Sequence, residues 1–205
     1  FTWGVQTHQI VDTKRWSQEF RLENNAFDDK LYYSFGLYYT DEESSNRIPS
    51  FETINLLTGA PRPITIPGTP IPYPPGFVQA HIDTTYQEVS FFANATYTFN
   101  EVFDLQAGIR YGKDEQEYDQ LYTGLLFAGF PGGEFALAQD SDNNKFQWML
   151  SGRYHPSENN SFWARVATGY RPGGPSAAVP GIVPFPTVVD SDSLISYEAG
   201  WKTVA

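Results

Sequence analysis

The segment EVSFFANATYTFNEVFDLQAGIRY, residues 88–111, decides the predicted fold because its side chains alternate between two faces. In its first half, one face carries Val89, Phe91, Ala93, Ala95, Tyr97 and Phe99. In its second half, the pattern resumes with Phe103, Leu105, Ala107, Ile109 and Tyr111. A repeat of two residues is the period of a β-strand with one apolar face. Only Asn100 and Glu101 separate the two runs, so we predict an antiparallel hairpin.

Five further segments alternate in the same way: Trp16–Glu23, Leu31–Thr40, Lys145–Tyr154, Ser161–Tyr170 and Leu194–Thr203. The chain thus holds seven predicted strands, no predicted helix, and links of two lengths. Short links cover 24–30, 100–101 and 155–160, and long ones cover 41–87, 112–144 and 172–192. Tight turns at one end and long external loops at the other are typical of outer-membrane barrels. The sequence predicts an all-β, antiparallel, up-and-down transmembrane β-barrel segment, about seven long strands of a larger barrel.

Aromatic residues near both strand ends support this prediction. Four strands carry aromatic pairs eight residues apart: Phe91 and Phe99, Phe103 and Tyr111, Phe146 and Tyr154, and Phe162 and Tyr170. Along a strand tilted by ~40°, this spacing covers roughly 20 Å of the membrane normal, close to the ~25 Å apolar band of a barrel. We therefore expect the apolar face to contact lipid between two aromatic girdles.

Charged residues divide between strands and links. The chain has 13 Lys and Arg against 24 Asp and Glu, a net charge of -11, and the three long links hold the whole acidic excess. In the strands the charges balance and lie opposite the apolar face, which predicts a lumen lined by compensating ions. The predicted lumen-facing charges are Glu19, Arg21, Asp104, Arg110, Arg153, Arg165, Glu198 and Lys202. The acidic links are candidates to bind divalent cations that bridge lipopolysaccharide.

Composition excludes several classes of protein. Nucleic acid is not a predicted partner because its phosphates require clustered Lys and Arg. The chain lacks cysteine, which excludes disulfides and thiol chemistry. The three histidines are far apart, and the calcium-loop-like segment 140–151 has Lys145 where Gly is required, so we predict no metal site, cofactor or catalytic residue. Because Phe1 is not an initiator methionine, we expect a segment of a longer precursor.

Three motifs follow one another along the chain: RWSQEFRL at 15–22, FWARVATGYRPGG at 162–174 and SYEAGWKT at 196–203. They resemble the S-Q-E-L-R-L, Y-A-R-x-A-x-G-Y-R-P-G-G and Y-E-x-G-x-K strands of TonB-dependent outer-membrane receptors. Such receptors have an N-terminal plug inside a barrel of about 22 strands. The resemblance implies that residues 1–205 form about a third of that barrel, with no plug domain in this chain.

The same resemblance implies a location in the bacterial outer membrane and no enzymatic activity. It implies energy-dependent uptake of a scarce ligand, with a ferric siderophore as the first candidate and cobalamin or an oligosaccharide next. The implied partners are outer-membrane lipid, lipopolysaccharide and the small-molecule ligand. The TonB inner-membrane complex would be reached through the N-terminal part that this chain lacks.

Candidate ligand contacts lie near the long-link ends of the strands. Arg171 follows Tyr170 and precedes the Pro-Gly-Gly sequence, where it either clamps an anionic ligand or forms an ordinary salt bridge. Tyr73 and Tyr122 lie in long links, as do Phe77 and Phe127. These aromatic side chains either stack on a flat or sugar-like ligand or pack within the loops.

Three other protein classes compete with this interpretation. A soluble extracellular β-sandwich that binds carbohydrate predicts Phe91, Ala93 and Phe99 buried against a second sheet. A carboxylate-based hydrolase requires two acids that converge within ~5–9.5 Å in one cleft. A plain porin shares the barrel but lacks the plug.

Overall fold

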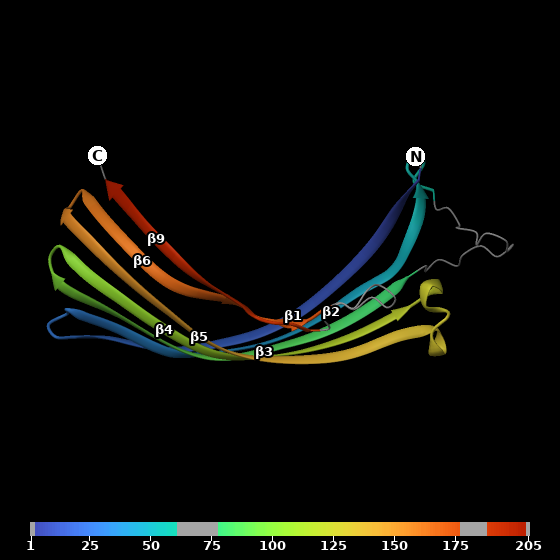
Figure 1. Ribbon diagram of the computed structural model, residues 1–205, viewed down its shortest axis with the longest axis horizontal. Helices are drawn as coiled ribbons and strands as arrows, with labels where there is room; N and C mark the ends of the chain where they lie inside the picture. Colours follow the sequence, from blue (N-terminus) through green and yellow to red (C-terminus); the bar gives the residue numbers. More distant parts are fainter. Residues whose placement is uncertain (1–2, 61–77, 177–187, 204–205) are drawn as a thin grey trace.

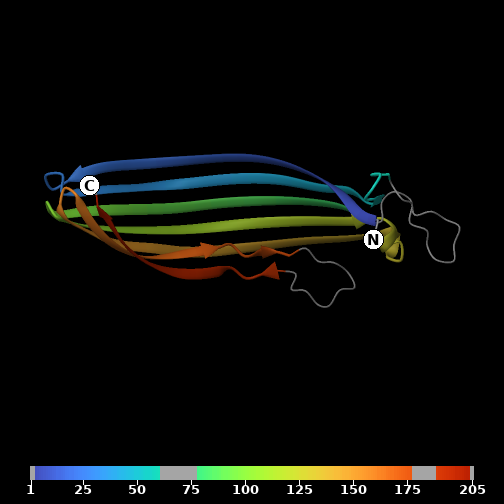
Figure 2. The same ribbon diagram turned by 90° about the horizontal axis from the view of Figure 1, so that it is seen from above.

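The computed structural model describes residues 3–60, 78–176 and 188–203, most of which form one long antiparallel sheet (Figures 1 and 2). Its strands are β1 (Trp3–Ala26), β2 (Leu31–Asn55), β3 (Gln79–Asn100), β4 (Phe103–Thr123), β5 (Glu134–Ser157), β6 (Asn160–Arg171) and β9 (Asp192–Thr203). Their order in the sheet, β1-β2-β3-β4-β5-β6-β9, follows the chain. The predicted all-β meander of seven long strands is therefore confirmed.

The remaining elements are short. Two single-turn helices, η1 (Leu125–Phe127) and η2 (Pro131–Gly133), connect β4 to β5, and the two-residue strands β7 (Gly174–Pro175) and β8 (Val188–Val189) pair with each other. Within the described ranges, no helix has the length and apolar character needed to cross a membrane.

Strands β1 to β5 extend further than predicted, β1 back to Trp3, and the extensions of β2 to β5 correct the bounds of two long links. Residues 41–55, 79–87, 112–123 and 134–144 belong to strands, so these connections shrink to 56–78 and 124–133. The backbone ladder continues where the apolar pattern stops, for example through Glu115↔Asp142 and Glu43↔Thr85. The prediction followed hydropathy, and a strand with polar side chains on both faces has no hydropathy period to detect.

Register places the apolar side chains on one face. Leu37, Phe91, Tyr111 and Phe146 are successive neighbours across β2 to β5, and the direct pairs Ala93↔Ile109 and Ala95↔Ala107 share their face. This apolar face is open: Phe91 is 42% exposed and Phe146 60%. In the part of the chain that the structure describes, no second sheet covers it. The β-sandwich interpretation is therefore wrong, because it requires these side chains to be buried.

The opposite face, called the polar face below, holds the buried strand residues other than glycine. They are Ser34, Thr40, Ala80, Ser90, Asp104, Asp114, Gln120 and Ala167. Side chains crowd together on the hollow side of a bowed sheet, and Figure 1 shows that this sheet is strongly bowed along its strands. The polar face is therefore the inner side of the curve, and the exposed apolar face is the outer side.

Strands β6 and β9 end well before the far ends of β1 to β5 (Figure 2). The β5–β6 ladder stops at Met149↔Ala167, where the Thr168 hydroxyl accepts a hydrogen bond from the Trp148 amide at 2.8 Å. Beyond this point β6 follows β9 alone, to Arg171↔Asp192. The predicted girdle position of Tyr170 is therefore wrong. The Tyr170 side chain does not lie on the apolar face with Phe162, because its hydroxyl donates a hydrogen bond to Asp114 on the polar face.

Candidate functional site

A network of arginine, tyrosine and glutamate side chains crosses the polar face from β1 to β4. Arg110 Nη2 donates to Glu88 Oε1 at 2.5 Å, and the Tyr86 hydroxyl donates to Glu88 Oε2 at 2.9 Å. The Arg110 guanidinium also lies over the Tyr38 ring, 5.5 Å from its centroid. Arg15 Nη2 donates to the Tyr38 hydroxyl at 2.9 Å. Two guanidinium groups thus flank one phenol, an arrangement suited to anionic or aromatic groups.

A second cluster surrounds Asp114, which is only 1% exposed. Its carboxylate accepts hydrogen bonds from Asn143 Nδ2 at 2.9 Å, from Gln116 Nε2 at 3.4 Å and from the Tyr170 hydroxyl. The Lys145 ammonium lies over the Tyr170 ring, 5.6 Å from its centroid. A buried carboxylate is costly unless it is hydrogen-bonded, and here neutral donors from three strands provide those bonds.

The predicted lumen-facing charges all lie on the polar face. Arg21 Nη2 donates to Glu19 Oε1 at 2.6 Å and its guanidinium lies over the Phe92 ring. Arg153 pairs with Asp104 at 2.9 Å, and Arg110 with Glu88 as above. Arg165 lies directly opposite Glu198 in the β6–β9 register. That this face lines the lumen of a complete barrel stays a prediction.

The predicted ligand contacts have different surroundings. Arg171 forms an ion pair with Asp192, and both side chains are mostly exposed, so the salt-bridge alternative describes the arrangement. Tyr122 stacks on Phe127 with ring centroids 5.7 Å apart, and Phe127 is 2% exposed. The Tyr122 ring, near the end of β4, therefore packs against the β4–β5 connection, and burial raises the pKa of the Tyr122 hydroxyl. Tyr73 and Phe77 lie outside the described residues.

Sequence reasoning missed Tyr38, Tyr86, Glu88 and Asp114. Glu88 and Asp114 are directly paired across β3 and β4, but the prediction ended both strands near these positions. The pairing Tyr97↔Leu105 could have been continued outward from the hairpin to Glu88↔Asp114, which would have placed both acids on the polar face. The contact of Tyr170 with Asp114 has no such signal, because it depends on the departure of β6 from β5.

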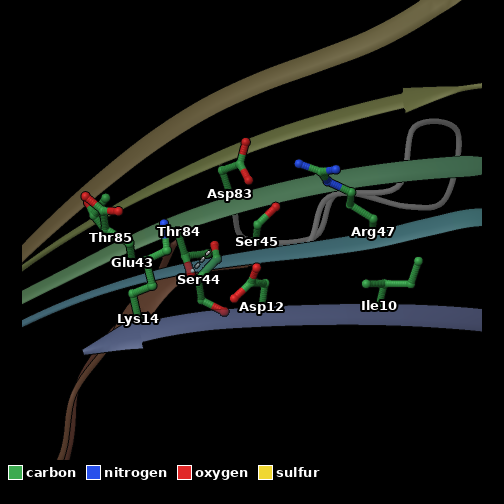
Figure 3. A pocket seen from close by; sticks show the side chains of 10 residues that line it. All are labelled: Ile10, Asp12, Lys14, Glu43, Ser44, Ser45, Arg47, Asp83, Thr84 and Thr85. Carbon is green, nitrogen blue, oxygen red and sulfur yellow. Dashed lines mark hydrogen bonds between the residues drawn. The ribbon is translucent and has the colours of Figure 1, made fainter.

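The outer face beyond the apolar band carries charges of both signs. A hollow of about 390 Å³ between β1, β2 and β3 is lined by Asp12, Lys14, Glu43, Arg47 and Asp83 together with polar and apolar neighbours (Figure 3). Lys14 lies directly opposite Glu43 in the register. Within the described ranges, no three His, Asp or Glu side chains are grouped so that they could hold a metal ion.

Solved structures show the same fold. The ferric yersiniabactin uptake receptor FyuA from Yersinia pestis matches 100% of this chain with a TM-score of 0.65 and 20% identity. The closed form of the ferric-catecholate import receptor Fiu from E. coli K12 matches 94% of the chain with a TM-score of 0.68 and 19% identity. The siderophore receptor PiuA from Acinetobacter baumannii also matches 94%, with a TM-score of 0.64 and 13% identity.

This chain is much shorter than those receptors, of which it covers 28% to 29%. No curated protein sequence matches the chain. The family profile described as "TonB dependent receptor-like, beta-barrel" matches residues 2–203, nearly the whole chain. The chain therefore belongs to the β-barrel family of TonB-dependent receptors, which are transporters of the bacterial outer membrane and not enzymes.

Proposed function

We propose that this barrel segment serves the energy-dependent uptake of a ferric siderophore, with its polar face toward the lumen. The observation that carries the proposal is the pair of guanidinium groups, Arg15 and Arg110, on either side of Tyr38. Ferric siderophores are bulky and commonly anionic, with planar catecholate or phenolate groups. Arginine recognises such groups through charge-assisted hydrogen bonds and stacking. Three structural neighbours of this fold are receptors for siderophores, which supports the same class.

The two arginines keep donor capacity for a ligand. Their side chains are 54% and 41% exposed, although both already contact protein groups. Glu88 and Tyr86 hold Arg110 in place, so binding would require little new ordering of the side chain. Tyr170 and Arg171 are proposed as secondary contacts, at the same end of the strands. Cobalamin or an oligosaccharide would depend less on charge and more on tyrosine stacking.

The other proposed partners follow from the family. The TonB complex would act through a plug and N-terminal segment outside this chain, in the manner of TonB-dependent receptors. Lipid would cover the apolar face. Lipopolysaccharide would meet the charged outer face, directly at cations such as Lys14 or through divalent cations at the acids.

Uptake of radioactive iron by cells that produce the full-length receptor tests this proposal. A host without its own siderophore receptors would be supplied with ferric catecholate, phenolate or hydroxamate siderophores, one at a time. For the transported siderophore, we expect Arg110→Ala and Arg15→Ala to reduce apparent affinity by about 10-fold or more, since a charge-assisted contact contributes ~1.5–3 kcal/mol. Lys113→Ala is the matched control, because Lys113 pairs with Glu115 on the outer face.

Measuring uptake in the presence of an uncoupler, which collapses the proton gradient across the inner membrane, distinguishes a TonB-dependent receptor from a porin. Receptor-mediated uptake stops when the proton gradient collapses, whereas diffusion through a porin continues. Uptake that is insensitive to the uncoupler would refute the proposal. If the receptor transports cobalamin or an oligosaccharide and none of the siderophores, the proposed ligand class is wrong and the transported compound takes its place.

A further inference from the structure

The last residue of β6 and the residues that follow it fold back onto the polar face. We call Arg171–Ser176 the strap. Gln116 Nε2 donates to the carbonyl oxygen of Gly173 at 2.7 Å, and Gln120 Nε2 donates to that of Ser176 at 3.3 Å. Both glutamines lie on β4, so the strap passes over β5, which it also contacts. Gln120 is only 3% exposed, consistent with the strap lying over it.

The two glycines of the strap allow this close approach. A Cβ on Gly174 would lie 2.7 Å from Gln116 Oε1, and a Cβ on Gly173 would lie 2.7 Å from the backbone nitrogen of Ser191. The contact at Gly173 is with backbone, so a side chain there would force the strap away from the returning segment, whereas a methyl group at Gly174 would mainly move the flexible end of Gln116. The Pro-Gly-Gly sequence therefore has a packing role at this position.

Two further contacts fix the base of the strap. Tyr170 is tied to β4 through its hydrogen bond to the buried Asp114. Arg171 is tied to Asp192, the first residue of β9, where the connection returns to the sheet. Contacts from β4 and β9 thus determine where the strap lies, which distinguishes it from a loop that extends into solvent.

We propose that the strap is an inward-folded element that limits the size of molecules reaching the polar face of β4 and β5, and that Gln116 and Gln120 are its positioning residues. The role of the strap in ligand selection rests on the proposed function. If the ligand is a bulky siderophore, it would have to pass the strap to reach that face. The shielding itself is a physical property of the receptor and does not depend on which ligand it transports.

Thiol labelling on intact cells tests the shielding without any ligand. Ser141 pairs with Gln116 on the polar face and its hydroxyl is buried, whereas the neighbouring Asp142 points to the outer face and is exposed. This chain has no cysteine, so Ser141→Cys and Asp142→Cys would each add a single thiol to a receptor made cysteine-free elsewhere. Each is labelled with a small membrane-impermeant maleimide and with one that carries a bulky polyethylene glycol chain.

We expect the Ser141→Cys receptor to react at least about ten-fold more slowly than the Asp142→Cys receptor, with the larger difference for the bulky reagent. Adding Gln116→Ala and Gln120→Ala should accelerate labelling at position 141 by about ten-fold, since two anchoring hydrogen bonds are lost. Labelling at 142 should not change. Gln87→Ala, an exposed glutamine on the outer face, is the matched control.

Equal labelling rates at 141 and 142 in the unaltered strap would overturn the proposal. So would a rate at 141 that does not respond to loss of the glutamines. If the double glutamine variant does not fold, Gly173→Ala displaces the strap through its contact with backbone atoms, with both glutamines in place, and must produce the same acceleration. Failure of siderophore uptake would count against the proposed function only, because the labelling rates are measured without a ligand.

Discussion

An arginine at Ala107 gives the most direct test of the orientation of the sheet. Ala107 lies on the apolar face between Ala95 and Leu150, midway between the aromatic residues Phe103 and Tyr111 of the same strand. At ~3.3 Å per residue and a tilt near 40°, it is about 10 Å from each girdle along the membrane normal. This position is close to the bilayer midplane, where an arginine on the lipid face costs about 2–4 kcal/mol.

The expected result is a lower free energy of unfolding for Ala107→Arg by that amount, roughly a 30- to 900-fold change in the folding equilibrium. The full-length receptor would be titrated with denaturant in lipid vesicles, with folding followed by tryptophan fluorescence. Gln106→Arg is the matched control, because Gln106 is the preceding residue and lies on the polar face between Thr96 and Ser151. If Gln106→Arg costs as much as Ala107→Arg or more, the assignment of the two faces is incorrect.

Three further substitutions test contacts on the polar face. Asp104→Asn should lower the unfolding free energy in the same titration by about 1–3 kcal/mol, because Arg153 loses a carboxylate partner that is itself buried; an unchanged value would show that the pair contributes nothing. Gly200→Ala should be destabilising by about 1–3 kcal/mol, because its Cβ would lie 2.6 Å from Cε2 of the Trp163 indole, and a shift in tryptophan emission should accompany the loss. Tyr170→Phe should accelerate thiol labelling at position 141, since it removes the hydrogen bond to Asp114, whereas Tyr197→Phe, at an exposed tyrosine, should leave that rate unaltered.

The sequence was sufficient for the part of the fold that is exposed to lipid. Between Val89 and Phe99 the membrane requires apolar side chains on one face, and this requirement produces a period of two residues that can be read directly. The structure places the hairpin turn at Glu101–Val102, one residue beyond the predicted Asn100–Glu101, and a register shift between Thr98 and Asn100 brings Tyr97 opposite Leu105. The predicted charges lie opposite the apolar face for the same reason, and that this face lines the lumen stays a prediction.

The candidate site was harder to predict because nothing periodic marks it. Outside the membrane, a strand such as Lys113–Thr123 needs no apolar face, so its alternation disappears although its backbone pairing continues. The interaction of Tyr170 with Asp114 joins residues far apart in the chain across an intervening strand. It depends on the point at which β6 separates from β5, and that point is set by tertiary packing around Thr168.

The extent of the strands changes where ligand capture would begin. On the outer face of β4 the side chains turn from apolar to charged between Tyr111 and Lys113, where we therefore expect the edge of the membrane. The ladder from Lys113 to Thr123 then continues, at ~3.3 Å per residue and a tilt near 40°, for about 25 Å beyond that edge. Much of the sequence that was predicted to form loops therefore continues the strands of the sheet. Asp114, Gln116 and Gln120 lie on the inner side of this extended part. On the proposed function, a ligand that enters along this inner side would meet the strap at Gln116 and Gln120 first and the arginine–tyrosine network at Arg110 next.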